Sequence, residues 1–258
     1  MPETLTSKEN RHIKQYKLLQ SDRKTRRETE LLVTEGVRLC MEALSSGLEI
    51  LQVFITEGCL AKSPECEGLL AKAGEAFVIS EGLSNGLSDT KSPQGVFCIC
   101  RQPVPQNPVY DQPVLLLENI NDPGNMGTIL RTAEALGITL AVCSADCCDI
   151  YSPKVLRGSM GSAFRLNISI TPDMPRTISE LSGSGYQTLA AVPDRDAQSI
   201  ADIAKAPKTA IAIGNEANGL TDETIAACTN RVTIPMAGRA ESLNAAMAAG
   251  ILMWELLR

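Results

Sequence analysis

At 258 residues, the chain is long enough for one large domain or two of ordinary size, each able to bury a hydrophobic core. Its composition, 44% hydrophobic and 21% charged, excludes an intrinsically disordered protein. No apolar run approaches the roughly 18 residues of a membrane-spanning helix, and the polar N-terminus lacks the pattern of a signal peptide. We therefore expect a cytoplasmic protein with no membrane partner.

Cysteine and histidine content narrows the possible chemistry. The nine cysteines include no CxxC pair, and Cys98 and Cys100 lie in an apolar run, so we expect buried thiols and no bound metal. His12 is the only histidine. Catalytic schemes that need a histidine in the C-terminal half are therefore excluded.

The charge distribution is uneven. The net charge of -6 argues against indiscriminate nucleic-acid binding, yet residues 8–27 contain eight basic and two acidic side chains. Such a run is either a solvated helix face or a patch that contacts RNA, and the sequence leaves both interpretations open. The candidates for RNA contact in this N-terminal arm are Arg11, Lys14, Arg23, Lys24, Arg26 and Arg27.

The N-terminal half has the pattern of a small α/β domain. Apolar periodicity predicts a helix over 35–47, and strand-like runs follow at 50–56 and 94–101, with further short elements between them. Residues 101–114 hold four prolines and an asparagine, which predicts a linker. We therefore expect two domains, 1–107 and 108–258.

The C-terminal half alternates between apolar strands and helices. Strands are expected at 114–118, 138–143, 166–170, 186–192 and 209–214. Helices are expected from about Asn125 to Leu136, around 154–157, near Ile178, after Leu220 and from about Ser242. This alternation predicts an α/β fold with a mostly parallel sheet covered by helices on both faces.

Polar loops follow two of these strands, 114–118 and 209–214, and a third polar segment leads into the last helix. In such folds, ligands bind beyond the carboxyl ends of the strands. The first loop holds Asn119, Asn121 and Asn125, and the helix that follows it carries Arg131. A capped turn explains the glycines of this loop and one asparagine or aspartate, but it does not explain three asparagines. It also does not explain an arginine in the first helical turns, where the helix dipole disfavours a positive charge. An arginine there is suited to grip a phosphate or carboxylate.

The second and third loops are also rich in small and polar residues. The second contains Gly214, Asn215, Glu216 and Gly219, without a dinucleotide fingerprint or the lysine of a phosphate-binding loop. The third places Ser242 and Asn244 before a run of small residues, and its simplest interpretation makes Ser242 a helix N-cap.

Taken in order, these loops resemble the three motifs of the SpoU (TrmH-like) family of RNA 2'-O-ribose methyltransferases, in the SPOUT superfamily. The matching segments are DPGNMGTILRTAEALG, IGNEANGL and IPMAGRAESLNAAMAAGI, within a resemblance that covers residues 114–258. The intervening YSPKVLRGSMGSAFRLNI is also similar to that family. The N-terminal half, with TEG before a helix and a basic lead-in, resembles the ribosomal-protein-like substrate-binding domain of many members.

The resemblance implies a homodimer of α/β subunits, each with a C-terminal trefoil knot, that uses S-adenosylmethionine to methylate a ribose 2'-hydroxyl. It implies a cofactor site formed by Ile213, Gly214, Asn215, Gly219, Ile234, Met236, Ser242, Leu243 and Asn244. It implies a catalytic set of Arg131, Asn125, Glu216, Ser242 and Asn244. In the family, Arg131 removes the hydroxyl proton with help from the RNA phosphate. Because a guanidinium normally stays protonated, Arg131 could instead orient the phosphate and hydroxyl and contact the RNA directly.

The RNA substrate stays open at this point. Members with this N-terminal extension commonly act on large-subunit ribosomal RNA, and others act on tRNA. Two further alternatives are a non-catalytic RNA-binding assembly factor on the same scaffold and another α/β enzyme, such as a nucleotide-binding transferase. The first should have degraded motifs and the second a phosphate loop, and neither feature is present.

Overall fold

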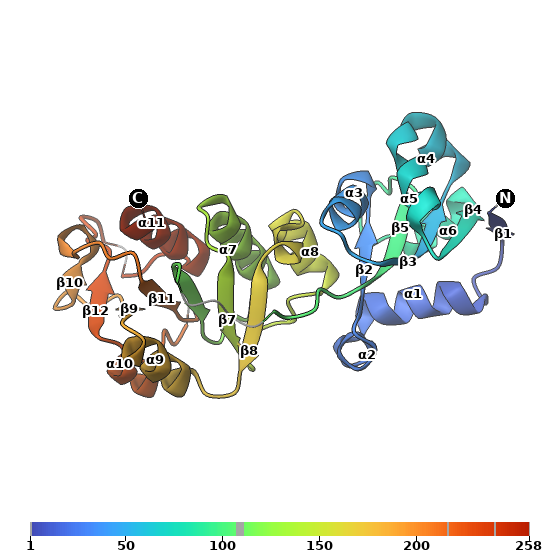
Figure 1. Ribbon diagram of the computed structural model, residues 1–258. Coiled ribbons are helices and arrows are strands. Elements are labelled where there is room, and N and C mark those ends of the chain that lie inside the picture. Colours follow the sequence, from blue (N-terminus) through green and yellow to red (C-terminus); the bar gives the residue numbers. More distant parts are fainter. Residues whose placement is uncertain (1, 107–110, 216, 240, 258) are drawn as a thin grey trace. The chain divides into compact units, whose positions relative to one another are not determined.

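The computed structural model describes residues 2–106, 111–215, 217–239 and 241–257 (Figure 1). The chain divides into two compact units. The first consists of the chain as far as Val104 together with Tyr151–Phe164, and the second of Pro105–Ile150 together with the chain from Arg165 onward. The domain boundary expected at 107/108 lies outside the described residues and stays a prediction.

The first unit is built on a mixed sheet with the strand order β1-β4-β3-β5-β2. Strand β5 runs antiparallel to both of its neighbours, whereas β1, β4 and β3 are parallel to one another. The strands are β1 (Glu3–Leu5), β2 (Leu31–Glu35), β3 (Ile50–Ile55), β4 (Glu75–Ile79) and β5 (Val96–Arg101). The helices are α1 (Arg11–Ser21), α2 (Arg23–Thr29), α3 (Val37–Ser45), α4 (Glu57–Lys62), α5 (Glu67–Lys72), α6 (Glu81–Leu87) and α8 (Pro153–Ser159), with short 3-10 turns at Pro64–Cys66 and Ser162–Phe164.

The basic N-terminal stretch forms packed helices, not an extended arm. Asn10 caps α1 by accepting a hydrogen bond from the backbone N–H of His12 at 2.8 Å. Ile13, Tyr16 and Leu19 recur every three residues and are buried in the core of the unit. The charged residues between them therefore lie on the exposed face of α1.

The second unit contains a seven-stranded sheet with the order β10-β12-β9-β11-β6-β7-β8, and all its described strand pairs are parallel. The predicted fold class is confirmed. The expected strands correspond to β6 (Val114–Leu117), β7 (Leu140–Ser144), β8 (Asn167–Thr171), β9 (Gln187–Ala191) and β11 (Thr209–Ile213). The sequence patterns did not predict β10 (Gln198–Ser199) and β12 (Asn230–Thr233), which are short and mainly polar.

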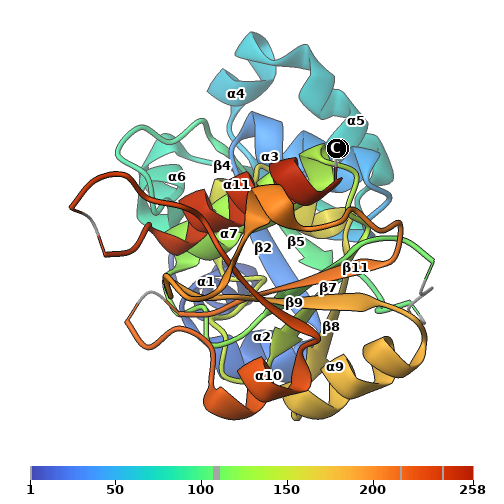
Figure 2. The ribbon, with the colours of Figure 1, turned by 90° about the vertical axis from the view of Figure 1, so that its left-hand side faces the viewer.

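Helices cover both faces of this sheet (Figure 2). Helices α7 (Pro123–Ala135) and α11 (Ala245–Leu257) pack together on one face, and α9 (Met174–Gly183) and α10 (Asp222–Ala227) on the other. A 3-10 turn at Ile200–Asp202 completes the unit. No helix in the described ranges is long and apolar enough to cross a membrane.

Two helices begin two or three residues away from their predicted starts. Helix α7 begins at Pro123, not Asn125, because the Asp122 carboxylate caps it by accepting from the Asn125 backbone N–H at 2.8 Å. Helix α11 begins at Ala245, not Ser242. Its N-cap is Asn244, whose Oδ1 accepts from two backbone N–H groups of the first turn, so the interpretation of Ser242 as the cap was wrong.

Candidate functional site

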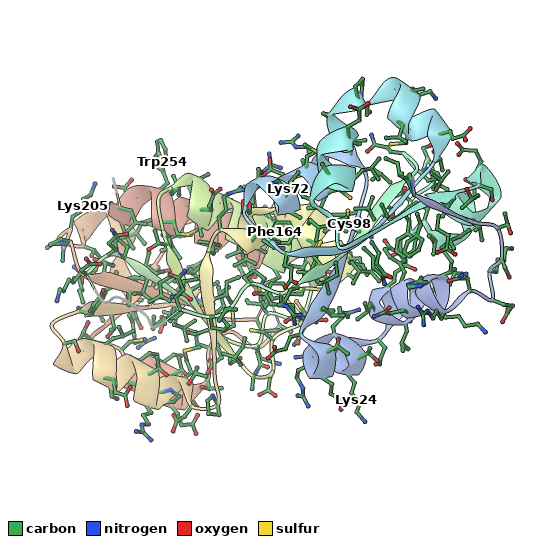
Figure 3. The ribbon with its side chains drawn as sticks, turned by 45° about the vertical axis from the view of Figure 1, so that its right-hand side comes forward. Lys24, Lys72, Cys98, Phe164, Lys205 and Trp254 are labelled. Atoms are coloured by element: carbon green, nitrogen blue, oxygen red, sulfur yellow. The ribbon has the colours of Figure 1, made fainter. Side chains whose placement is uncertain are left out.

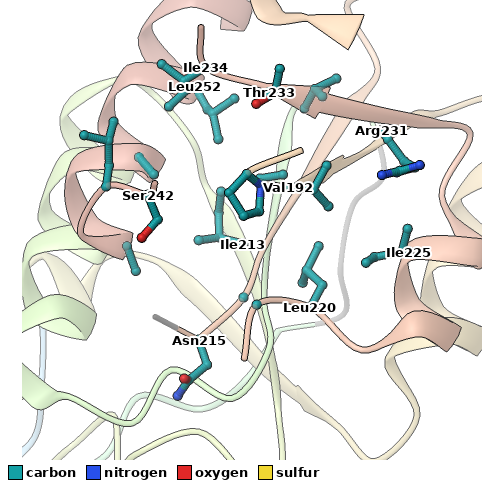
Figure 4. Close-up of a pocket in the computed structure, with 18 of the residues that line it drawn as sticks. Val192, Ile213, Asn215, Leu220, Ile225, Arg231, Thr233, Ile234, Ser242 and Leu252 are labelled. Carbon is teal, nitrogen blue, oxygen red and sulfur yellow. The ribbon is translucent and has the colours of Figure 1, made fainter. Parts of the chain in front are cut away.

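A cavity of about 510 Å³ lies at the carboxyl ends of β9, β11 and β12 (Figure 4). Its walls come from the loop after β11, the segment after β12 and the first turns of α11. Eight of the nine expected cofactor residues line it, namely Ile213, Gly214, Asn215, Gly219, Ile234, Met236, Ser242 and Leu243. The ninth, Asn244, lies next to this set in the chain but does not line the cavity.

The loop after β11 folds tightly back on itself. The backbones of Asn215 and Gly219 exchange hydrogen bonds of 3.2 and 2.9 Å, and Gly219 has a left-handed φ of 68°. A Cβ atom on Gly214 would lie only 2.2 Å from the Gly219 carbonyl carbon and 2.4 Å from the Leu220 backbone nitrogen. Position 214 therefore requires glycine, because two backbone segments meet there.

The first and second motif loops are joined by a hydrogen bond. The Asn215 side-chain Nδ2 donates to the backbone oxygen of Asn119 at 2.9 Å. Asn119 itself has a φ of 57°, in the left-handed region that asparagine tolerates better than most residues. This backbone conformation explains one of the asparagines that a capped turn left unexplained.

The first and third motif loops are joined in the same way. The Asn244 Nδ2 donates to Asn125 Oδ1 at 2.9 Å, while Asn244 Oδ1 accepts from Ala246 N at 3.0 Å and Met247 N at 3.3 Å. Asn244 thus caps α11 and fixes the side chain of Asn125 on α7. Together with the Asn215 contact, this pair brings all three loops to one place.

Arg131 lies on the exposed face of α7 and does not line the cavity. Within the described part of the chain, its guanidinium makes no hydrogen bond or ion pair, so it is available to an external anion. Because α7 begins at Pro123, Arg131 is the ninth residue of a thirteen-residue helix. The expected conflict with the helix dipole therefore does not apply. Glu216, the other charged catalytic candidate, lies outside the described residues.

The basic candidates of the first unit differ in exposure. Arg26 is only 4% exposed, and its guanidinium donates to the backbone oxygens of Leu19 and Gln20 at 2.5 and 3.1 Å. Arg26 therefore ties α2 to the end of α1, and its prediction as an RNA contact was wrong. The remaining candidates, Arg11, Lys14, Arg23, Lys24 and Arg27, are exposed, and Figure 3 shows Lys24 at the surface of α2.

Sequence reasoning missed Glu118, which directly follows β6. Its carboxylate is buried and accepts hydrogen bonds from Thr221 N at 2.8 Å, Thr221 Oγ1 at 3.1 Å and Thr224 Oγ1 at 2.6 Å. Burial raises the pKa of the Cys228 thiol to about 12, and the negative charge of Glu118 adds to that rise. An acidic residue directly after a fully apolar strand was the available signal.

The single histidine of the chain belongs to the first unit. His12 is buried in the first unit, where its ring nitrogen is 2.8 Å from the Gln52 amide. Among the residues that the structure describes, no group of three or more potential ligands could hold a metal ion.

Known proteins with a similar sequence or structure identify the family. Residues 112–254 match the SpoU rRNA Methylase family, and residues 10–98 match the MRM3-like substrate binding domain. The chain is 28% identical, over 98% of both chains, to the 23S rRNA (guanosine(2553)-2'-O)-methyltransferase RlmP of Bacillus subtilis. An AdoMet-bound rRNA methyltransferase from Sinorhizobium meliloti matches with a TM-score of 0.85 and 28% identity, over 98% of this chain and 97% of that one. The SpoU methyltransferase AviRb from Streptomyces viridochromogenes, in complex with AdoMet, matches with a TM-score of 0.85 and 26% identity, over 96% and 97%.

The parallel α/β fold, the linked loops and these matches together define an RNA methyltransferase. The chain belongs to the SpoU rRNA methylase family. The predictions of the family, of the 2'-O-methyl transfer reaction and of S-adenosylmethionine as cofactor are confirmed.

Proposed function

We propose that this protein methylates the 2'-hydroxyl of one nucleotide in large-subunit ribosomal RNA, in the cytoplasm. The observation that carries the proposal is the pair of asparagine contacts that joins three motif loops beside one cavity. The choice of RNA is supported by the similarity to RlmP over nearly the whole length of both chains. It is supported further by the match of residues 10–98 to a substrate-binding domain.

The cavity suits S-adenosylmethionine in size and in lining. Small-molecule sites usually have volumes of about 300 to 1,000 Å³ and combine apolar walls with a few placed polar groups. Here Ile213, Ile234 and Leu243 provide apolar surface, and Gly214 and Gly219 line the cavity without side chains of their own. Bound there, S-adenosylmethionine supplies an electrophilic methyl group, whose bond to sulfur breaks as the bond to the ribose oxygen forms.

Arg131 would orient the reacting groups. A guanidinium remains protonated in proteins, and its fork of N–H donors matches the oxygens of a phosphate. We assign Arg131 to the phosphate and 2'-hydroxyl of the target nucleotide, so that the oxygen is aligned for attack and its proton passes to water.

The asparagines and the third loop would hold this arrangement in place. Asn125 is fixed by Asn244, and both lie on or beside the helix that carries Arg131. Ser242 lines the cavity and would contact the cofactor. Glu216 would pair with Arg131 or with groups on the cofactor side.

The remaining expectations belong to the same proposal. The exposed basic side chains of α1 and α2 would bind RNA phosphates, and the first unit would serve as the substrate-binding domain. The C-terminal segment would form the trefoil knot of the family. A second copy of the chain would complete the active form as a homodimer.

The experiment compares 2'-O-methylated nucleotides in total RNA from cells with and without the gene. We expect one position in large-subunit ribosomal RNA to lose its methyl group and to regain it when the wild-type gene is restored. Arg131→Ala should not restore it, although the purified variant should bind S-adenosylmethionine with unchanged affinity by calorimetry. We expect methyl transfer by this variant to fall by at least about 100-fold.

Arg176→Ala is the matched control, because Arg176 is an exposed helical arginine on α9 that pairs with Glu180 at 3.0 Å. It should restore methylation fully. A lost methyl group in tRNA would show that the RNA is wrong, and full activity of Arg131→Ala would show that the active-site assignment is wrong.

A further inference from the structure

Glu118 is a buried carboxylate that is held by hydroxyl and amide donors. Its residue is 6% exposed, and none of the described residues forms an ion pair with it. All three of its hydrogen bonds come from Thr221 and Thr224, at the start of α10. Burying a carboxylate without a counter-charge is costly, so its retention calls for an explanation beyond capping a short helix.

This carboxylate lies directly behind the cavity wall. Leu220 and Asp222 line the cavity, and the residue between them, Thr221, donates both its backbone N–H and its hydroxyl to Glu118. The residue that binds the carboxylate therefore lies between two lining residues in the chain. In such a poorly hydrated position, charges interact more strongly than they do in water.

Among the described residues that line the cavity, acidic side chains outnumber basic ones. Asp222 and Glu241 are the described acidic side chains of the lining, and Arg231 is the described basic one. Arg231 is already neutralised by an ion pair with Asp194. The described surroundings of the cavity therefore carry an excess of negative charge.

We infer that Glu118 makes the cavity favour the positively charged cofactor over its neutral product. The sulfur of S-adenosylmethionine carries a positive charge, which disappears when the methyl group leaves and S-adenosylhomocysteine forms. A fixed negative charge behind the wall stabilises only the first of these two sulfurs. Glu118 is thus a positioning and specificity residue that acts through Thr221 and the start of α10. This inference rests on the proposed binding of the cofactor in the cavity.

The test measures the dissociation constants of both compounds by calorimetry with the full chain and without RNA. Glu118→Gln keeps the shape of the side chain, and the threonine hydroxyls can turn to accept from its amide. We expect this variant to bind S-adenosylmethionine about 5- to 10-fold more weakly, because one attractive charge is lost. Its affinity for S-adenosylhomocysteine should change less than twofold. Glu223→Gln removes an exposed charge from the same helical turn and should change neither affinity.

A second variant tests whether the affinities depend on the charge of Glu118 or on the geometry of the loop that it holds. Thr224→Val removes one hydrogen bond to Glu118 but keeps the carboxylate, so it should change both affinities by the same factor. If Glu118→Gln does not fold, Asp222→Asn removes a charge from the cavity wall and should weaken S-adenosylmethionine selectively. The inference would be overturned if Glu118→Gln changed both affinities equally or changed neither. The same holds for Asp222→Asn where it replaces Glu118→Gln. A wild-type chain that binds neither compound would instead contradict the proposed cofactor site.

Discussion

At the scale of single residues, Gly214 is the most constrained position of the site. Its missing side chain allows the Gly219 and Leu220 backbones to lie against it, and Gly214→Ala would place a Cβ atom 2.2 Å from the Gly219 carbonyl carbon. The loop would have to move, and the cavity wall with it. We expect affinity for S-adenosylmethionine to fall by at least about tenfold, a free-energy change of roughly 1.4 kcal/mol or more.

The matched control for this glycine is Gly183→Ala. A Cβ atom there meets nothing within 4 Å, and the residue ends α9. Calorimetry and thermal unfolding should show unchanged cofactor binding and a small gain in stability, up to about 1 kcal/mol, because alanine favours helix more than glycine. A Gly214→Ala variant that binds the cofactor normally would show that the loop can adapt.

The sequence predicted which residues gather at the site better than it predicted how each is held. The resemblance to the three motifs of the family placed Asn125, Asn215 and Asn244 in one site, and their hydrogen bonds show how the loops are joined. The burial of Arg26 depends on the angle between two short helices, which a run of basic residues does not specify. Glu118 was missed because a carboxylate at the end of an apolar strand resembles an ordinary solvent-facing residue.

At the scale of elements, Asn244 links the start of α11 to Asn125 on α7. Asn244→Ala should remove both functions, costing about 1 kcal/mol of stability through the lost cap and also lowering methyl transfer. Asn244→Asp should keep the cap, because a carboxylate accepts from the same backbone N–H groups, but it cannot donate to Asn125 Oδ1. We therefore expect near wild-type thermal stability and strongly reduced transfer. Equal activity of the aspartate variant and the wild type would show that the contact with Asn125 is dispensable.

Element types were predicted more accurately than element ends. Long apolar runs were enough to predict β6, β7 and β11, since a strand buried on both faces needs them. Helix α7 began two residues earlier than expected because Pro123 fits the first helical turn once Asp122 caps it. Helix α11 began later because Asn244, not Ser242, accepts the first N–H groups. Such ends depend on single hydrogen bonds, whereas apolar periodicity extends over several turns.

At the scale of the whole molecule, the alternation of strands and helices predicted the parallel sheet, and the motifs predicted the family. The position of α8 was not predicted. Its segment Tyr151–Phe164 lies between two strands of the second unit in the chain but packs with the first unit. A local pattern predicts that a helix forms there, but the surface on which it packs is decided by contacts distant in the chain.

The exposed face of α11 supplies the last prediction, which concerns assembly. Met247, Ile251 and Trp254 recur at helical spacing and are 61%, 37% and 50% exposed, and Figure 3 shows Trp254 projecting from the surface. On the same helix, Ala248 and Leu252 line the cavity. A second copy that covers this apolar face would bury it and would also support one wall of the site.

Light scattering should therefore give twice the 27.6 kDa mass of one chain. Trp254→Glu should give a folded monomer with much weaker methyl transfer, whereas Ile170→Glu, at a 57% exposed residue on β8, should remain a dimer. A monomeric wild-type chain with full activity, or a dimer lost only with Ile170→Glu, would show that α11 is not the interface.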